Sequence, residues 1–417
     1  MNEYNNKISY LICEGLYMDI SKFKIDLIHF FFAGILTSNA IVYLFKGGGV
    51  SNSIVLLVGG LVVLILLFSR FKPIVRLKTE QLLLFVFLFI ILVFSLFFAP
   101  HYGMDLVKRQ FFFFMLMGLG TLSVSNYDYD FEKLLKSIII ISLLVAPVLL
   151  TGNFTDKEGL LEIDEKEEWM GYGYAIVTFI IADLFYLTSY KGKWWKAISI
   201  VALLLYVPSF FWHSSRGAFG AIFGFIFLVF LQNKLLSGVK LTRSIAGVLS
   251  LFFVLFVLYI VFDVKTLLID SGMNSLTKFF EEGDVSNGRN SLYAMAMEGF
   301  WGSPIWGNGV GSFANYTIYP HNLFVQFLYE GGVLLFGVMT WILYKSVRYI
   351  LNTRIDVNRI RLLLFVFSCS FFELSFSATY WEKPRFWLTV WITLAIFNEF
   401  KKHRSKVYAV THPAIQD

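Results

Sequence analysis

Hydrophobic residues along this chain are grouped in long blocks, and polar residues are confined to the segments between the blocks. The segment 81–99, QLLLFVFLFIILVFSLFFA, contains no charged residue at all. A helix needs about 20 such residues to cross the roughly 30 Å hydrocarbon layer of a membrane. The strands of an outer-membrane barrel would instead alternate apolar and polar residues. The pattern therefore predicts an all-α polytopic membrane protein.

About twelve of these blocks are candidates for transmembrane helices. They lie near 27–45, 53–69, 81–99, 110–124, 134–151, 174–189, 195–212, 217–232, 245–263, 322–344, 362–378 and 386–399. The first block follows a mixed-charge stretch, and no A-x-A-like site ends it, which indicates a retained helix rather than a signal peptide. No internal repeat or soluble domain is visible, so residues 1–417 are predicted to form a single transmembrane domain.

Composition and charge agree with a membrane protein. Hydrophobic residues make up 57% of the chain and charged residues 15%, with a mean hydropathy of +0.67; soluble domains carry roughly 25% charged residues. If both termini are cytoplasmic, most of the 35 lysines and arginines fall in cytoplasmic segments, as the positive-inside rule requires. The net charge of +6 therefore reflects topology and attraction to the cytoplasmic leaflet, and no nucleic-acid partner is expected.

In this orientation the two longest outer connections are 152–173 and 264–321. The first is acidic over 156–168, which is typical of a solvated loop; a lid or a docking surface for a basic partner is the alternative. Its aromatic, glycine-rich end, with Trp169 and Tyr172, suits an interfacial belt or the stacking of a sugar ring.

The second connection contains NGRNSLYAMAMEGFWG at 287–302, which predicts a short amphipathic helix at the membrane interface. Gly307, Gly309 and Gly311 follow it in PIWGNGVGSF and predict a tight irregular turn. A dinucleotide fingerprint would need a strand before these glycines and a helix after them. Neither is predicted, so no cofactor is expected.

Four arginines lie on the outer side: Arg109, Arg216, Arg289 and Arg385. Charges beside the hydrocarbon layer are functional candidates because burying them is costly. Arg216 stands in the bend FFWHSSRGAFGAIFGF, where it would be fixed in place for bidentate recognition of a phosphate. The alternative for each arginine is a side chain that reaches the lipid headgroups.

His321 begins an apolar segment in YTIYPHNLFVQFLYEGG. Pro320 restricts the approach of the chain, and Asn322 supplies an amide beside the start of a predicted helix. A neutral imidazole there could take a proton from a hydroxyl group, although a structural histidine is the alternative. Arginines and a histidine together suit a lipid-linked diphosphate, which the arginines would hold and stabilise as a leaving group. No acidic cluster with Mg²⁺ spacing is visible, so no metal is expected.

The order SSRGA, GRNSLYAMAMEGFWGSPIWGNGVGSF and PHNLFVQFLYEGG resembles the O-antigen ligase and O-antigen polymerase superfamily of bacterial envelope enzymes. The resemblance covers roughly 210–340 in motif detail, and the pattern of twelve spans agrees with it over the whole chain. It implies a GT-C-like membrane glycosyltransferase acting on undecaprenyl-diphosphate-linked glycans at the periplasmic face of the inner membrane. It also implies that Arg216 and Arg289 bind the diphosphate and that His321 is the base.

Position 319 is Tyr, where ligases of this superfamily often carry a second histidine, and WEKPRFW at 381–387 is more similar to polymerases. The expected activity is therefore an inverting polymerase that transfers the glycan onto a lipid-linked repeat unit, together with a chain-length-regulating co-polymerase. The alternative is a ligase that transfers the glycan to lipid A-core. Further candidates for the substrate cavity are Arg109, Arg385, Asn322, Tyr293, Trp169 and Tyr172.

A flippase for lipid-linked glycans is the alternative from another class of protein. It would place charges along the spans on a path between the leaflets. The predicted spans are nearly free of charge, with Asp183 and Glu373 as the main exceptions, each expected to pair with a neighbour. Glu330, nine residues after His321, is expected to contribute to packing.

Overall fold

The computed structural model describes residues 20–41, 77–98, 111–112, 114–127, 129–151, 163–213, 216–236, 289–315, 319–352, 357–376 and 379–411. Within these ranges the regular structure is entirely helical, and no strand is present. The all-α class predicted from the sequence is therefore confirmed. The predicted spans at 53–69 and 245–263 lie outside the described ranges.

The α-helices are α2 (Ile20–Leu36), α3 (Ser38–Ile41), α5 (Thr79–Phe98), α7 (Leu119–Val124), α8 (Phe131–Thr151), α9 (Ile163–Ser189), α10 (Lys193–His213), α11 (Arg216–Leu236), α15 (Arg289–Gly302), α16 (Leu323–Asn352), α17 (Val357–Phe376) and α18 (Pro384–Thr411). A π-helical segment, η3 (Phe114–Gly118), precedes α7, and 3-10 turns occupy η4 (Ser312–Asn315) and η5 (Tyr380–Glu382).

Most predicted spans coincide with one of these helices, but their boundaries differ in places. The block at 110–124 is divided between η3 and α7. α9 begins at Ile163, so the second half of the predicted connection 152–173 is helical. The residues IDEKEE that begin α9 are mostly strong helix formers, which explains why the helix extends beyond its apolar part.

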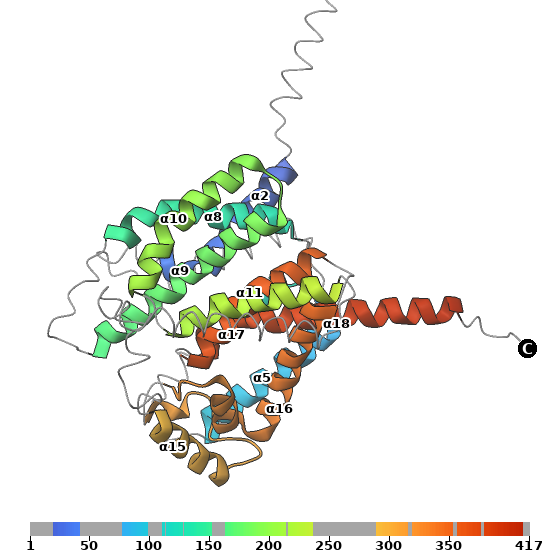
Figure 1. The fold of residues 1–417 in the computed structure, drawn as a ribbon. Coiled ribbons are helices and arrows are strands. Elements are labelled where there is room, and N and C mark those ends of the chain that lie inside the picture. The colour runs from blue at the N-terminus through green and yellow to red at the C-terminus, as the bar shows by residue number, and fades with distance from the viewer. Residues whose placement is uncertain are drawn as a thin grey trace, which may run out of the picture.

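The helices form a layered bundle (Figure 1). α8, α9 and α10 pack on one another, and α2 lies against α8. α11 and α18 pack against α17, while α16 and α5 cover the other side of α18. α15 lies on α16 at the end of the bundle where α11, α16 and α18 begin, opposite the C terminus. We call this the His321 end.

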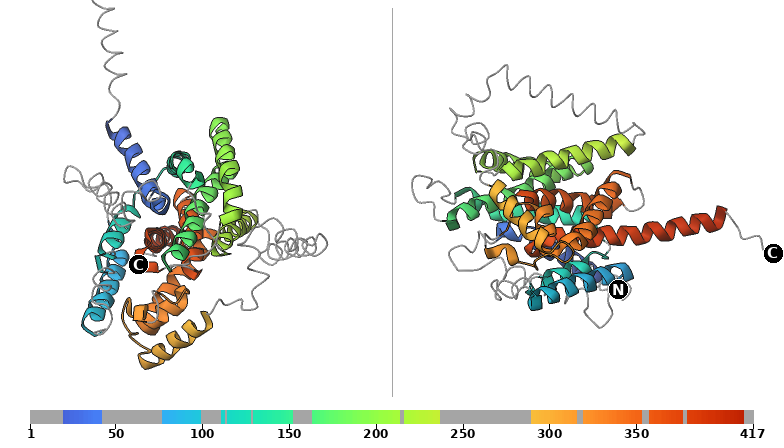
Figure 2. Two further views of the ribbon diagram at one scale, coloured as in Figure 1. Left: turned by 90° about the vertical axis from the view of Figure 1, so that its left-hand side faces the viewer. Right: turned by 90° about the horizontal axis from the view of Figure 1, so that it is seen from below.

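α17 occupies the centre of the bundle, as the view from the His321 end shows (Figure 2, left). Every side chain from Leu362 to Ser370 is buried. A helix that is apolar on all sides is buried on all sides, and α17 is accordingly surrounded by α9, α11, α16 and α18. The glycines of α11 allow part of this packing, because a side chain at Gly217 or Gly224 would collide with Phe376 or Phe372 of α17.

Two helices in the described ranges are long and apolar enough to cross a membrane, Gly217–Leu235 in α11 and Leu323–Leu351 in α16. Large apolar side chains are also exposed along other helices. α5 exposes Leu82, Leu83, Val86, Ile90 and Phe97, and α10 exposes Ile200, Val201, Leu204 and Leu205. These positions recur at helical spacing and form continuous apolar faces, which are uncommon on soluble monomers.

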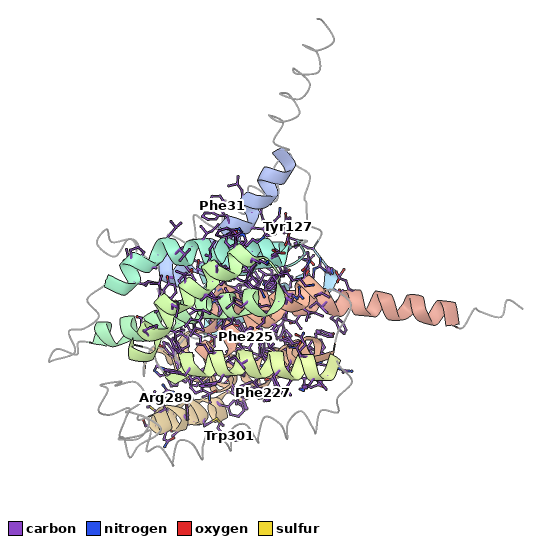
Figure 3. The ribbon with its side chains drawn as sticks, turned by 45° about the horizontal axis from the view of Figure 1, so that its top comes forward. Phe31, Tyr127, Phe225, Phe227, Arg289 and Trp301 are labelled. Atoms are coloured by element: carbon purple, nitrogen blue, oxygen red, sulfur yellow. The ribbon has the colours of Figure 1, made fainter. Side chains whose placement is uncertain are left out.

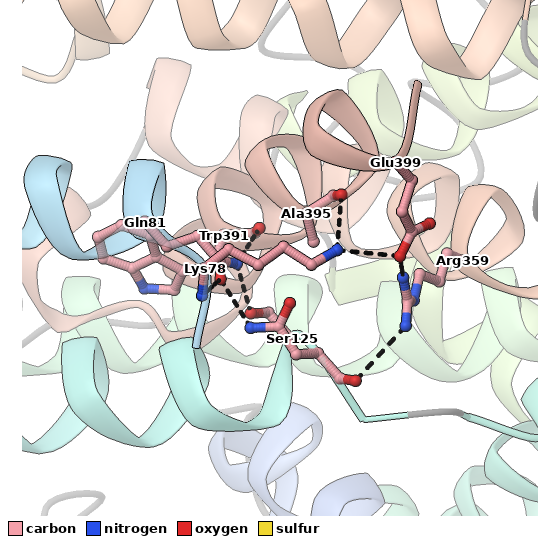
Figure 4. A network of polar contacts seen from close by, with 8 residues as sticks. Lys78, Gln81, Ser125, Arg359, Trp391, Ala395 and Glu399 are labelled. Atoms are coloured by element: carbon pink, nitrogen blue, oxygen red, sulfur yellow. Dashed lines mark hydrogen bonds and ion pairs between the residues drawn. The ribbon is translucent and has the colours of Figure 1, made fainter. Parts of the chain in front are cut away.

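The opposite end of the bundle is held by a polar network (Figure 4), which defines the Glu399 end. Glu399 of α18 accepts a hydrogen bond from Lys78 at 2.9 Å and pairs with Arg359 of α17. Gln81 of α5 donates to Ser125 at 3.0 Å and to the carbonyl of Trp391 at 2.8 Å. The network therefore joins α5, the end of α7, α17 and α18.

Candidate functional site

The start of α16 is built around His321 and Asn322. The Asn322 side chain accepts hydrogen bonds from the backbone N–H groups of Phe324 at 3.0 Å and Val325 at 3.2 Å. It is therefore the N-cap of α16 and satisfies two of the N–H groups that the first turn leaves unpaired. Asn322, a candidate for the substrate cavity, therefore caps and stabilises the start of α16.

His321 is the one non-glycine residue with a positive φ in the described part of the chain, at 55°. This left-handed conformation is uncommon for a residue with a side chain, and where it persists the surroundings hold it. The imidazole lies edge-on against Tyr319, with ring centroids 4.4 Å apart, and Pro320 is buried beside it. The residue as a whole is only partly buried, although Nδ1 of its ring is buried, so His321 is fixed in direction while part of its surface stays accessible.

Glu330 lies two turns further along α16, buried to 2% exposure, and accepts three side-chain hydrogen bonds. Gln326 donates to Oε1 at 2.8 Å, and Tyr380 and Trp381 of η5 donate to Oε2 at 2.8 and 2.9 Å. Gln326 also reaches Thr379 Oγ1 at 2.9 Å. The carboxylate thus fastens the segment 379–381 to α16, consistent with the packing role expected for Glu330.

Burial, together with the nearby Glu330 carboxylate, raises the pKa of the Tyr380 hydroxyl well above its ordinary value. The hydroxyl therefore stays protonated and keeps donating to Glu330 across the physiological pH range.

The glycine-rich turn after α15 wraps around a break in α16. Gly332 has φ 60° and ψ −160°, which interrupts the helix, and the N–H of Val333 bonds to the carbonyl of Pro304 at 2.9 Å. The N–H groups of Asn308 and Gly309 bond to the carbonyls of Tyr329 and Glu330 at 2.8 and 3.0 Å. The turn thus supplies partners for backbone groups at the break.

The predicted tight turn is confirmed by the positive φ angles of Gly307, Gly309 and Gly311, at 74°, 96° and 76°. Gly307 also lies so close to α16 that a side chain there would collide with the backbone of Glu330 and Gly331. Close backbone approach, rather than phosphate binding, therefore explains this glycine.

Arg289 is the first residue of α15, and the predicted helix at 287–302 is confirmed as Arg289–Gly302. Ala296 is buried with Phe313 and Tyr329, and Leu292 packs against the same cluster, which fixes α15 on α16. The first turn of α15 has no acidic residue, and Arg289 has no carboxylate partner within the described ranges. Figure 3 places its side chain near the start of α15.

Tyr293 lies one turn after Arg289 and is partly exposed, so the two side chains share one face of α15. Tyr293, a candidate for the substrate cavity, therefore lies beside Arg289 on α15.

Arg385, by contrast, is fully engaged inside the protein. Its side chain is 3% exposed, donates to Glu373 of α17 at 2.8 Å and also bonds to Thr178 of α9. Lys383 pairs with the other oxygen of Glu373 at 2.8 Å. The expected pairing of Glu373 is confirmed. Arg385 therefore joins α9, α17 and α18, and its charge is balanced within the fold.

Asp183 is buried on α9 without a cationic partner in the described ranges, unlike Glu373.

Arg216 is the first residue of α11 and follows α10 after a connection of residues 214–215, as the predicted short bend requires. The side chains of Arg216, Trp169 and Tyr172, and the whole of Arg109, lie outside the described part of the chain. Three helices begin at the His321 end of the bundle (Figures 1 and 2): α11 with Arg216, α15 with Arg289, and α16, which follows His321.

Sequence reasoning missed Gln326, Thr379, Tyr380 and Trp381, which surround Glu330. The segment at 381–387 is similar to polymerases in sequence, but no local pattern links it to α16. No group of three or more histidine, cysteine, aspartate or glutamate residues that could hold a metal ion occurs among the described residues.

No known protein-family model matches this chain. No curated protein matches it either. The candidate site therefore rests on its geometry and on the motif resemblance.

Proposed function

We propose that the chain is a multi-pass protein of the bacterial inner membrane, with a GT-C-like arrangement of about twelve spans and both termini in the cytoplasm. Exposed apolar faces on α5 and α10 support this embedding, since only lipid can cover them without a protein partner. In this orientation the His321 end faces the periplasm and the Glu399 end faces the cytoplasm. Trp194, 85% exposed beside Lys191 and Lys193, suits the cytoplasmic interface.

The proposed activity is that of an O-antigen polymerase, which transfers a glycan from undecaprenyl diphosphate onto a lipid-linked repeat unit. The observation that carries it is the start of α16, where His321 is held in a left-handed conformation at the end of the bundle that also presents Arg289. Strained backbone that the surroundings maintain is concentrated at functional sites.

In the proposed reaction the imidazole of His321 removes the proton from an acceptor hydroxyl. The hydroxyl oxygen forms a bond to the anomeric carbon of the donor with inversion. The bond from that carbon to the phosphate oxygen breaks, and its electron pair leaves with undecaprenyl diphosphate. Arg216 and Arg289 stabilise the negative charge of the departing diphosphate.

The position of the arginines supports an anionic substrate. Arg216 and Arg289 each begin a helix, where the helix dipole disfavours a positive charge, and neither helix has an acidic residue in its first turn. A bound diphosphate would reverse this penalty, because helix N-termini and arginines both attract phosphate oxygens. Arg385 is left out of this role because Glu373 already neutralises it.

The experiment that tests the proposal is a lipopolysaccharide gel from a strain of the source bacterium that lacks this chain. A deletion that leaves the core with a single repeat unit supports a polymerase. Full-length glycan that accumulates on undecaprenyl diphosphate, with none on the core, identifies a ligase instead. A normal ladder in the deletion strain contradicts both activities.

The same strain complemented with His321→Ala should copy the deletion while the protein still reaches the membrane. Arg348→Gln, an exposed position of α16 far from its start, is the matched control and should restore the ladder. A normal ladder with His321→Ala would remove His321 from the mechanism.

A further inference from the structure

A cavity of 450 Å³ opens between α9, α11 and α17 at the opposite end of these helices from the candidate site. It lies where α9 and α11 end and α17 begins, and its lining includes Arg361, Gln232, Ser189, Phe185, Val229 and Leu364. This is the size range of small-molecule sites in proteins. None of these residues belongs to the proposed transferase mechanism.

Polar and apolar residues of the cavity are separated along the helix axes. Ser189 is the last residue of α9, and Phe185 lies one turn deeper in the bundle. Asn233 and Val229 repeat this arrangement on α11, since they too are one turn apart. On α9 and α11 the polar lining residues therefore lie toward the mouth and the apolar ones lie deeper, while α17 contributes the exposed Val357 at the mouth. This arrangement suits a molecule with a charged head and a hydrocarbon tail.

Arg361 supplies the charge at this cavity. Its Nη1 lies 3.4 Å from the Tyr190 hydroxyl, and the guanidinium lies 5.3 Å from the centre of the Tyr190 ring, so the side chain is fixed against that ring. Arg361 is partly buried, yet no carboxylate pairs with it in the described ranges. A partly buried charge without a counter-ion is unfavourable, and a bound anion would relieve this.

The neighbouring Arg359 shows that this lack of a counter-ion is local. Two residues before Arg361 on the same helix, Arg359 pairs with Glu399. Glu399 is thus already shared by Arg359 and Lys78. Glu132 lies near Tyr190 but pairs with Lys136, and no carboxylate forms an ion pair with Arg361 within the described ranges.

We propose that this cavity binds an anionic membrane phospholipid, whose phosphate meets Arg361 at the mouth and whose acyl chain lies along Phe185, Val229 and Leu364. Basic pockets between helices at the cytoplasmic side of a membrane are suited to anionic headgroups. Lys191 and Lys193, exposed just beyond the end of α9, add to the positive potential at the mouth. The proposal rests on the membrane orientation proposed above and is independent of glycosyl transfer.

The test is native mass spectrometry of the full-length protein in mild detergent, titrated with phosphatidylglycerol or with zwitterionic phosphatidylcholine. One phosphatidylglycerol should bind preferentially, and Arg361→Gln should weaken it about tenfold through loss of a charge-assisted contact. Arg348→Gln, an exposed arginine of α16 outside the cavity, should bind as the wild type does. Equal binding by Arg361→Gln, or equal binding of both lipids, would overturn the proposal.

Two further arms identify the source of the phosphate and the place of the acyl chain. Millimolar inorganic phosphate should not displace the lipid; displacement would mean a free-phosphate site instead. Val229→Phe fills the interior while it leaves Arg361 in place, and it should also abolish lipid binding. Unchanged binding by Val229→Phe would overturn the proposal. If Arg361→Gln does not yield monodisperse protein, the Val229→Phe variant alone provides the test.

The O-antigen ladder separates this proposal from the transferase. A strain with Arg361→Gln should still make repeat-unit polymer, because the cavity is remote from His321. Loss of lipid binding with a normal ladder supports the lipid site whatever the fate of the catalytic proposal.

Discussion

Both ends of the helix bundle combine paired arginines with one that has no carboxylate partner within the described ranges, Arg361 at the Glu399 end and Arg289 at the His321 end. At the Glu399 end, Lys78 and Arg359 share one carboxylate, and the network joins four elements of the fold. At the His321 end, Arg385 is equally well paired, with Glu373, but Arg289 has no carboxylate partner within the described ranges. Cations that are balanced inside a protein hold helices together, and one that is not balanced is available to a ligand.

Backbone conformation separates the two ends more clearly than charge pairing does. α17 begins at the Glu399 end and α18 passes through it, both as regular helices. The His321 end contains a left-handed histidine, a capped helix start and a break at Gly332 that a glycine turn covers. The regular helices of the Glu399 end stabilise the fold. The strained backbone of the His321 end, held by its surroundings, fixes particular side chains in place.

The largest expected effect is on stability, at the paired arginine of the His321 end. Glu373→Ala leaves Arg385 and Lys383 without their shared carboxylate, and removal of one partner from a buried ion pair costs about 3–5 kcal/mol. The free energy of unfolding in detergent should fall accordingly. The exposed Glu298→Ala on α15 is the control and should change it little. Equal stability of the two variants would mean that the buried pair does not hold the helices.

Arg289 should affect activity rather than stability. Arg289→Ala should lower the rate of glycan transfer about a hundredfold or more, because one charge-assisted contact to the transition state is lost. Arg289→Lys should recover little of this loss, since a point charge cannot replace the planar fork. The rate is measured with purified protein at unchanged melting temperature. Full activity of the lysine variant would contradict bidentate binding of the diphosphate.

A substitution at Gly307 tests whether the glycine-rich turn, which packs on the break in α16 at Gly332, positions the candidate site. Gly307→Ala should destabilise the protein by about 2 kcal/mol, because alanine disfavours a positive φ and its side chain meets the backbone of Glu330 and Gly331. Transfer activity should fall with it, since α16 would shift. Gly302→Ala is the matched control, because nothing lies within 4 Å of an added side chain there. If both alanine variants behave alike, the turn does not position α16.

The smallest effect is expected at the Glu399 end. Glu399→Gln removes two ion pairs, but the carboxylate is 31% exposed, and partly exposed pairs contribute about 1 kcal/mol or less. Stability should fall slightly, and the O-antigen ladder should be unchanged. A lost ladder with normal protein levels would mean that the Glu399 end is coupled to catalysis at the His321 end, and would contradict separate roles for the two ends.

The helices themselves could be predicted from the sequence because apolar run length is a local property. The same is true of the helix at 289–302 and the tight turn at Gly307 to Gly311. Each depends on residues within one or two turns of each other, so spacing alone reveals it.

The polar contacts of the His321 end could not be predicted in this way. Arg385 meets Glu373 and Thr178, which come from helices that are distant in sequence, and no local pattern marks them as partners. The break at Gly332 was also missed, because glycine within an apolar segment only lowers helix propensity by about 1 kcal/mol. The turn at Pro304, which completes the break, lies in a different part of the chain.

The central claim, that the His321 end catalyses glycosyl transfer, is tested most directly with purified protein in liposomes that contain undecaprenyl-diphosphate-linked repeat units. Release of undecaprenyl diphosphate is measured together with glycan length. We predict that the wild type releases one undecaprenyl diphosphate for each linkage formed and that His321→Ala releases almost none. Equal release by His321→Ala, or transport of the lipid-linked glycan without any release by the wild type, would contradict the account.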